Sequence, residues 1–508
     1  MIRTILAVTT AVVIATHTAA TAANPVFVNG LTIPGGKLDA TEQPGANAGR
    51  LGMFSDIYYD PGREEWWGLS DRGPGGGVLD YATRVQRFRL KVDQKTGTIS
   101  RFRVVETVQF RDPEGLLSAP TPAVGVTVTK PRALNGLNPE QLNDNVSVLG
   151  RSFDPEGIVI NPRNANLIIF DEYGPSIYEF RRNGRLKKVF ETPANLIPTR
   201  TNSTLDPGDD TMDYVGNRDV VQNGRQDNRG FEGLAVTPDG KKLFAVLQDP
   251  LFDEGGRDGR NVRIVVFDND PHSASYGKSI AQYAYPLELQ ANVRQRILDA
   301  GGEASDTDPR QGRNIGLSAI VAINEQEFLV LERDNRGLGV DDPEGDGVIG
   351  TKRVYKATID PQVATNITGM ALPSGDLSGT GITPVEKEEI DPFIDLAADT
   401  VLPSDKKAEK WEGLAIGPRL KDGSYLILAG TDNDYSVTQD AGNVQFDVYV
   451  DFEGNSVQRD IDRPTRLNGV EVGPIPEGHA LIPGVLHAYK TGPGDLAGYI
   501  APDQDHDD

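Results

Sequence analysis

The chain of 508 residues contains no cysteine and only five histidines. Without cysteine it has no disulfide, no thiol nucleophile and no thiolate ligand for a metal. The scattered histidines do not favour a histidine-based triad, and the G-x-S-x-G, H-E-x-x-H and Walker A patterns are absent. These absences exclude several common hydrolase mechanisms and leave carboxylates as the main chemical resource.

Basic residues are also scarce relative to acidic ones. The chain has 51 lysines and arginines against 74 aspartates and glutamates, and its formal net charge is −23. Such a charge argues against nucleic acid and against an anionic membrane surface as partners, and it permits the binding of cations.

Long apolar runs are missing except at the N-terminus. Residues 5–15 are largely apolar, Arg3 precedes them, and small residues at 20–22 offer a cleavage site. We predict a signal peptide over 1–23, cleaved near Ala22 or Ala23, with an uncleaved anchor as the alternative. The mature protein is then exported, periplasmic or extracellular, with a folded domain over 24–500, an acidic tail over 501–508 and no membrane insertion.

One short acidic phrase recurs along the chain. Its copies are DPEGI at 154–158, FEGLA at 231–235 and WEGLA at 411–415. From Gly233 in the second copy, a later acid, Asp249, follows after sixteen positions. The same spacing separates Ser55 from Asp71 and Gly316 from Glu332, which brings the count of copies to five. Apolar and aromatic residues alternate after each copy, and glycine turns separate the runs, which predicts four antiparallel strands per copy.

The sequence therefore predicts an all-β fold, a single β-propeller of five or six four-stranded blades with long loop insertions. The blade number stays open. The run at 26–28 could complete the last blade, and the insertions near 105–150 and 360–405 leave room for a sixth.

The repeat also predicts where the acids lie. Because adjacent strands are antiparallel, an acid at the start of strand one and an acid at the end of strand two share one edge of the blade. One mouth of the central channel should be ringed by Asp71, Glu156, Glu172, Glu232, Asp249, Glu332, Glu412 and Asp432. Arg72 and Arg333 each directly follow a ring acid, and the insertion at 206–229 should reach the same face.

Such a ring requires neutralisation. Two carboxylates about 6 Å apart at an effective dielectric near 20 repel by roughly 3 kcal/mol. Oxygen ligands without cysteine favour Ca²⁺ over zinc or copper, so we predict a calcium ion held by Asp71, Glu156, Glu232, Glu412 and Asp432. The alternative is that each acid is structural and accepts hydrogen bonds from backbone N–H groups.

Several motifs, in this order, resemble those of the phytase-like domain family, described as having esterase-like activity of phytase. They are GLSDRG at 68–73, DPEG at 154–157, DEYGP at 171–175, LERD at 331–334, WEGL at 411–414 and DN at 432–433. The resemblance covers most of the mature chain and implies an exported bacterial propeller with phosphoester hydrolysis as the expected activity. The R-H-G-x-R-x-P signature of histidine acid phosphatases is absent.

We therefore expect metal-assisted hydrolysis of a small anionic ester by a monomeric protein. Arg72 and Arg333 would stabilise charge on the phosphoryl oxygens, and Glu172 or Glu332 would take the proton of the attacking water. Two alternatives are a calcium-stabilised binding propeller without turnover and a hydrolase of lactones or carboxylic esters.

Overall fold

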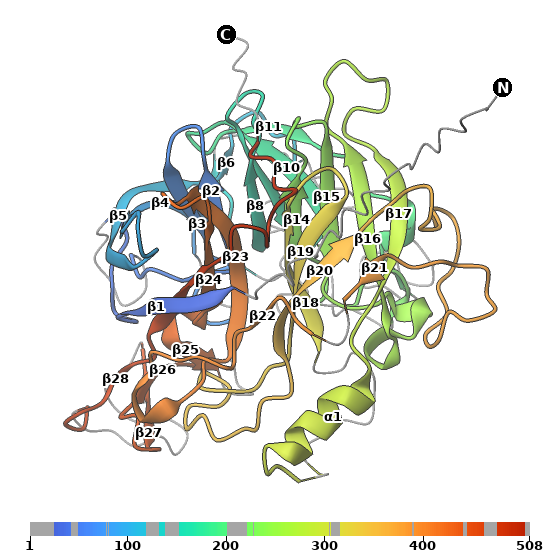
Figure 1. Ribbon diagram of the computed structural model, residues 1–508. Coiled ribbons are helices and arrows are strands. Elements are labelled where there is room, and N and C mark those ends of the chain that lie inside the picture. Colours follow the sequence, from blue (N-terminus) through green and yellow to red (C-terminus); the bar gives the residue numbers. More distant parts are fainter. Residues whose placement is uncertain are drawn as a thin grey trace, which may run out of the picture.

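The computed structural model describes residues 25–41, 49–77, 79, 81–117, 132–137, 152–200, 221–226, 228–303, 305, 315–388, 391–439, 444–461 and 475–502. Most of the strands belong to five antiparallel sheets of similar plan (Figure 1). The predicted signal peptide, residues 503–508 of the tail and most of the 206–229 insertion lie outside the described residues.

Each of the five sheets is one blade. The first contains β2 (Asp56–Asp60), β3 (Glu65–Leu69), β4 (Arg84–Val92) and β5 (Ile99–Gln109). The second contains β8 (Pro155–Ile160), β9 (Leu167–Asp171), β10 (Ser176–Phe180) and β11 (Leu186–Val189). The third contains β14 (Phe231–Val236), β15 (Lys242–Leu247), β16 (Asn261–Asp268) and β17 (Ser279–Pro286).

The last two blades carry the additions. The fourth contains β18 (Gly316–Ala322), β19 (Glu327–Arg333) and β20 (Lys352–Thr358), with β21 (Glu386–Lys387) and β22 (Ile394–Asp395) both paired to β20. The fifth contains β23 (Lys410–Arg419), β24 (Tyr425–Asp432), β29 (Gly484–Lys490) and the N-terminal strand β1 (Val26–Ile33).

Smaller elements lie in the connections between the strands of the blades. A separate sheet of β25 (Val437–Gln439), β26 (Gln445–Val450), β27 (Ser456–Asp460) and β28 (Ala480–Leu481) is inserted between β24 and β29. Two short ribbons pair β6 (Arg111–Asp112) with β7 (Arg132–Ala133) and β12 (Thr199–Arg200) with β13 (Val221–Asn223). The helices with bounds in the described part of the chain are α1 (Gln290–Asp299) and the 3-10 helices η2 (Ala194–Leu196), η3 (Phe252–Glu254), η4 (Gly256–Asp258), η6 (Pro403–Asp405) and η7 (Asp434–Ser436).

The inner strands close into a ring. Strand β2 contacts β8, β8 contacts β14, β14 contacts β18, β18 contacts β23, and β23 returns to β2. The predicted propeller fold is therefore confirmed, and the described residues form five blades. The described part of the 360–405 insertion adds β21 and β22 to the outer edge of the fourth blade and forms no sixth blade. Most of the 105–150 insertion lies outside the described residues.

The two ends of the chain close the propeller together. Strand β1 pairs antiparallel with β29, from Val26 opposite Lys490 to Ile33 opposite Gly484. The N-terminal run thus supplies the outer strand of the last blade, as the sequence indicated. Gly30 permits this contact, because a Cβ there would lie 2.6 Å from the carbonyl oxygen of Leu486.

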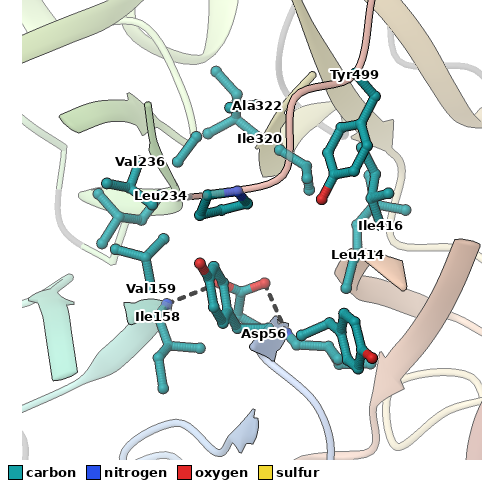
Figure 2. A pocket seen from close by; sticks show the side chains of 17 residues that line it. Asp56, Ile158, Val159, Leu234, Val236, Ile320, Ala322, Leu414, Ile416 and Tyr499 are labelled. Carbon is teal, nitrogen blue, oxygen red and sulfur yellow. Dashed lines mark hydrogen bonds between the residues drawn. The ribbon is translucent and has the colours of Figure 1, made fainter. Parts of the chain in front are cut away.

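The inner strands leave a narrow apolar space between them. Figure 2 shows this pocket, of about 40 Å³, with side chains from all five inner strands and with Tyr499 of the C-terminal segment. Asp56 is the acid among them, and its two carboxylate oxygens accept hydrogen bonds from the backbone N–H groups of Ile57 at 2.7 Å and Ile158 at 2.8 Å. Asp56 therefore links the backbones of the first and second blades.

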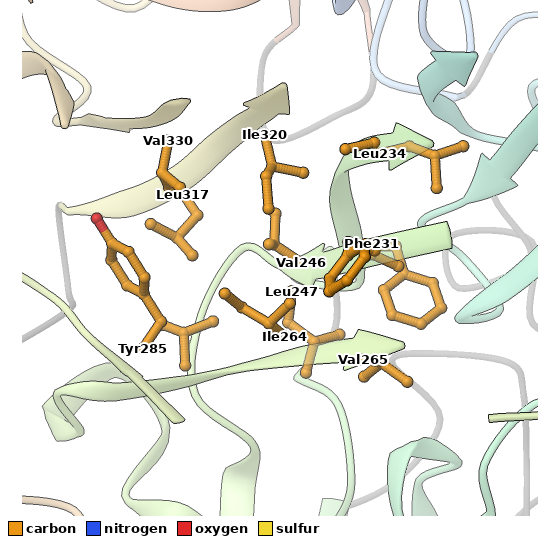
Figure 3. Packing of buried hydrophobic residues seen from close by; sticks show 14 of the residues in the cluster. Phe231, Leu234, Val246, Leu247, Ile264, Val265, Tyr285, Leu317, Ile320 and Val330 are labelled. Atoms are coloured by element: carbon orange, nitrogen blue, oxygen red, sulfur yellow. The ribbon is translucent and has the colours of Figure 1, made fainter. Parts of the chain in front are cut away.

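Apolar side chains between neighbouring blades form the core. In Figure 3, side chains of the third blade such as Phe231, Val246 and Ile264 pack with Leu317 and Ile320 of the fourth. Strands β8, β14 and β16 are buried along their whole length, because other parts of the fold cover both of their faces. Burial on both faces explains why these strands are nearly continuous apolar runs.

Candidate functional site

A β-bulge places the glutamate of each repeated phrase. The ladder between strands one and two is interrupted between Pro155 and Gly157, between Phe231 and Gly233, and between Trp411 and Gly413. The skipped residue is the glutamate in every case, and a bulge redirects the side chain that it adds to the strand. The bulges thus turn Glu156, Glu232 and Glu412 towards one cavity.

The glycine after each glutamate has a packing role. A Cβ at Gly233 would lie 2.8 Å from the backbone nitrogen of Ile320 in the next blade. At Gly157 it would lie 2.3 Å from the ring of Phe170, and at Gly413 2.7 Å from Ile57. The Glu-Gly pair therefore combines a redirected acid with close packing around the inner strand.

The glutamates face a polar cavity of about 280 Å³ at one mouth of the channel. Eight acidic and four basic side chains line it, in addition to polar groups such as Asn228, Gln248 and Asn335. The acidic residues are Asp71, Glu156, Glu172, Glu232, Asp341, Glu409, Glu412 and Asp434, and the basic residues are Arg72, Arg229, Arg333 and Lys410. Seven residues that the sequence assigned to the site are among them.

Arg333 links the glutamates of the third and fifth blades. Its Nη2 donates a hydrogen bond to Glu412 Oε1 and lies 3.9 Å from Glu232 Oε1. Its Nε donates to Ser318 Oγ at 3.0 Å, and its Nη1 donates to Asn335. Burial opposes the charge of the guanidinium, but the pKa of Arg333 is raised by Glu412 and Glu232. Arg333 is therefore a fixed cation on this side of the cavity.

Arg72 has the corresponding role beside the second blade. Its Nη1 donates to Asp154 Oδ2 at 3.0 Å and also to Asn228, and its backbone N–H donates to Asp154 Oδ1 at 2.9 Å. The guanidinium lies 5.8 Å from the centre of the Tyr173 ring. Its Nε is buried and has no partner among the described residues.

Lys410 is a cation of the site that the sequence analysis missed. Its Nζ lies 2.7 Å from Asp432 Oδ2, 2.9 Å from Asp434 Oδ1 and 3.7 Å from Glu412 Oε1. The lysine precedes the WEGLA phrase by one residue, and the other copies of the phrase have no lysine at that position. No repeated pattern could therefore have indicated it.

Other acids of the cavity remain without such partners. The carboxylates of Glu156 and Glu172 form no hydrogen bond or ion pair within the described part of the chain, although both residues are buried. Burial raises the pKa of Glu172 to about 8, and burial with Asp154 and Glu232 raises the pKa of Glu156 well above its ordinary value. Near neutral pH these two groups favour a proton or a cation.

Two groups of carboxylates are close enough to share a cation. The oxygens of Asp71, Asp154 and Glu156 lie within 4.8 Å of one another, and so do those of Asp71, Asp432 and Asp434. In the second group, the ammonium of Lys410 already contacts Asp432 and Asp434. In the first group Arg72 contacts Asp154, but Asp71 and Glu156 form no ion pair within the described residues, so this group is the better candidate.

The predicted position of Glu332 is corrected by the structure. Its carboxylate is buried outside the cavity and accepts hydrogen bonds from Tyr285 Oη at 2.8 Å, from the Glu288 backbone N–H at 2.9 Å and from Lys387 Nζ at 2.8 Å. The bulge of the fourth blade lies between Leu317 and Ala319, and Glu332 pairs with Leu317. The residue of β19 that corresponds to the cavity-facing acid of the other blades is therefore the next one, Arg333. An offset of one residue turns a strand side chain to the opposite face.

Two other ring acids lie at the margin of the site. Asp249 does not line the cavity; Arg229 Nε lies 3.4 Å from its Oδ2, and burial raises its pKa to about 6. Asp432 belongs to a carboxylate group with Asp71, and burial raises its pKa to about 7 while Lys410 opposes the shift. The predicted ring is thus a cavity in which some members are already paired.

A known family matches most of the chain. Residues 49–435 match the phytase-like family, which is described as esterase-like activity of phytase. The chain belongs to the phytase-like family. The match begins just before the first blade and ends just after β24, so it includes all of the carboxylates described above.

One relative in sequence is an uncharacterised secreted protein from Arthroderma benhamiae. It is 26% identical over 429 residues, which cover 74% of this chain and 78% of the relative. Among the helices in the described part of the chain, none has the length and apolar character required to cross a membrane.

Solved structures resemble the chain only distantly. A putative 6-phosphogluconolactonase from Bacteroides uniformis is 10% identical, with a TM-score of 0.26 and coverage of 84% of this chain and 86% of that one. The PQQ-bound aldose sugar dehydrogenase from Streptomyces coelicolor is 11% identical, with a TM-score of 0.26 and coverage of 92% and 100%. These values carry no argument about activity.

Proposed function

We propose that this protein is an exported, calcium-dependent hydrolase that cleaves phosphate esters in the acidic cavity. The observation that carries the proposal is the pair of buried, unpartnered carboxylates of Glu156 and Glu172 beside Arg72. Membership of a family described by phytase and esterase-like activity supports the reaction class. The signal-like N-terminus and the relative described as secreted support export.

The donor set fits a calcium ion. The carboxylates of Asp71, Asp154 and Glu156 supply hard oxygen ligands, and Glu232 Oε2 is buried without a partner among the described residues. Calcium bound there would supply a positive charge that polarises a phosphoryl oxygen. Glu232 and Glu412, which the sequence analysis also assigned to the metal, contact Gln248 and Arg333 and complete the wall of the cavity.

The protein's own residues then have distinct roles. Arg72 and Arg333 hold positive charge on two sides of the cavity and stabilise the negative charge that grows on the phosphoryl oxygens. Glu172 takes the proton of the attacking water as the water oxygen bonds to phosphorus and the bond from phosphorus to the leaving oxygen breaks, and solvent water supplies the proton to the leaving oxygen. Its pKa of about 8 without calcium falls when positive charge enters the cavity, so Glu172 becomes a base near neutral pH.

Turnover of p-nitrophenyl phosphate, p-nitrophenyl acetate and phytate, with calcium and after EDTA, tests the proposal. We expect calcium-dependent cleavage of the phosphate esters, and at least a tenfold loss of turnover and calcium affinity in Glu156→Gln. Glu453→Gln, at an exposed acid, is the matched control. Cleavage of p-nitrophenyl acetate alone would indicate a hydrolase of carboxylic esters. A calcium-dependent shift of the melting temperature without any turnover would indicate a binding propeller. Either result overturns the proposal.

A further inference from the structure

A second, much smaller cavity adjoins the acidic one. Its volume is about 10 Å³, and Val340, Glu409 and Asp434 line both cavities. The remaining wall comes from four segments: Leu338 and Gly339 after β19, Leu402 and Ala408 before β23, Thr431, Asp432 and Asn433 at the end of β24, and Ile482, Pro483 and Val485. A space of this size holds one water molecule or one dehydrated ion.

Glu409 presents a bare carboxylate at this cavity. The residue is 2% exposed, and neither Oε1 nor Oε2 accepts a hydrogen bond from the residues that the structure describes. The carboxylate lies against the backbone of Gly339, another lining residue, where an added Cβ would be 1.7 Å from Glu409 Oε2. A buried carboxylate without a partner is costly unless a cation or a proton neutralises it.

Asn433 adds a second unpartnered oxygen. The residue is 4% exposed, and its Oδ1 accepts no hydrogen bond within the described residues. Its Nδ2 donates to the carbonyl oxygen of Ile482 at 3.3 Å, which orients the amide beside another residue of the cavity wall. Glu409 and Asn433 thus supply independent oxygen acceptors to the same small space.

The neighbouring basic groups are already engaged. Lys352 Nζ lies 3.0 Å from Asp334 Oδ1 and donates to the backbone carbonyls of Asp334 and Glu409. Lys410 contacts Asp432 and Asp434. Besides burial, Asp341 and Asp434 raise the pKa of Glu409, while Lys352 and Lys410 oppose that shift only in part. Negative charge therefore exceeds positive charge around this cavity.

We propose that the small cavity is a second cation site, in which Glu409, Asn433 and Asp434 hold one hard divalent cation such as Ca²⁺. One water molecule could donate to only two of the three bare oxygens and would leave the carboxylate charge without compensation. The site is structural and does not depend on the hydrolysis proposed for the larger cavity.

Its position indicates what the cation stabilises. The site joins the loop after β19 to η7, the turn after β24. Three consecutive residues of this turn, Asp434, Tyr435 and Ser436, have φ angles of 44°, 56° and 60°, which residues other than glycine rarely adopt. The same turn leads to Val437 and Gln439 in the wall of the larger cavity, so the cation would fix that wall as well.

Counting bound calcium per chain tests the inference, by equilibrium dialysis with elemental analysis. Glu409→Gln keeps the size of the side chain and removes its charge, so this variant should bind one Ca²⁺ fewer than the natural chain. Because Glu409 lines both cavities, the double variant with Glu156→Gln should also bind one Ca²⁺ fewer than Glu156→Gln alone. Glu156→Gln reports on the larger cavity, and Glu453→Gln should bind as the natural chain does. An unchanged calcium count in a folded Glu409→Gln protein would overturn the inference.

A second variant keeps the inference testable if Glu409→Gln does not fold. Asn433→Asp adds a charged ligand of nearly the same shape, so calcium should bind at least tenfold more tightly and raise the melting temperature more than in the natural chain. If Glu409 is instead neutralised by a proton, Asn433→Asp will lower the melting temperature and calcium will not restore it. That result would also overturn the inference.

Discussion

Replacing Glu172 with glutamine should stabilise the calcium-free protein near neutral pH. The residue is 3% exposed and lines the acidic cavity, and its carboxylate has no partner among the described residues. Burial raises its pKa from the ordinary 4.5 to about 8, Asp154 adds to the shift, and Arg72 and Arg229 oppose it. Glu172→Gln removes the charge and keeps the size of the side chain.

The sign of the effect follows from proton binding. Between about pH 4.5 and pH 8 the folded chain keeps a proton on Glu172 that the unfolded chain has lost, so the free energy of unfolding falls as the pH rises through this window. At pH 7 the pH is about 2.5 units above the lower end of this window, and the free energy of unfolding has fallen by about 3 kcal/mol over that interval. Because neighbouring carboxylates share their protons, we expect about 1–2 kcal/mol for this one residue.

Urea unfolding in EDTA at several pH values measures this effect. The stability gain of Glu172→Gln over the natural chain should be close to zero near pH 4.5 and should grow to about 1–2 kcal/mol by pH 8. The exposed control Glu453→Gln should follow the natural chain. Saturating calcium should reduce the gain, because the ion neutralises the same cavity. Equal pH slopes for Glu172→Gln and the natural chain in EDTA would refute the assigned environment of Glu172.

Two further predictions concern the scaffold around the site. Glu332→Ala should lower the free energy of unfolding by about 3–5 kcal/mol, because it leaves Lys387 buried without its acidic partner. Calcium binding should not change. A loss of calcium binding in titration calorimetry would contradict the placement of Glu332 outside the cavity. Deleting residues 26–33 removes β1 and exposes the edge of β29. Thermal unfolding should therefore begin at a lower temperature, and self-association should increase in sedimentation experiments. An unchanged melting curve would show that the closing strand adds no stability.

The architecture could be predicted from the sequence because each blade repeats the same local sequence pattern. The Glu-Gly phrase corresponds to a β-bulge in three blades, and both of its residues have physical roles that constrain the chain. The acid is redirected to the cavity and the glycine permits close packing. A repeated motif with two constraints is visible without a structure, and so was the strand at 26–28 that completes the fifth blade.

The fourth blade shows where such counting fails. The spacing from Gly316 to Glu332 equals that from Ser55 to Asp71 and from Gly233 to Asp249. The bulge of the fourth blade lies at Ser318, however, so Arg333 and not Glu332 reaches the cavity. An inserted bulge residue changes the facing of every later side chain, and spacing alone cannot place the bulge. Residues such as Asp341 and Glu409 reach the site from connections whose paths depend on tertiary packing, so no local pattern predicts them.

The basic residues are distributed unevenly around the larger cavity. Beside the third to fifth blades, Arg333 and Lys410 together lie within 4 Å of Glu232, Glu412, Asp432 and Asp434. Beside the first and second blades stand Asp71, Asp154, Glu156 and Glu172, and in the described part of the chain Arg72 alone forms an ion pair with them, through Asp154. The excess of negative charge is therefore on the side where three carboxylates lie within 4.8 Å of one another. A cation held by these three carboxylates would neutralise acids that the protein's own bases leave uncompensated.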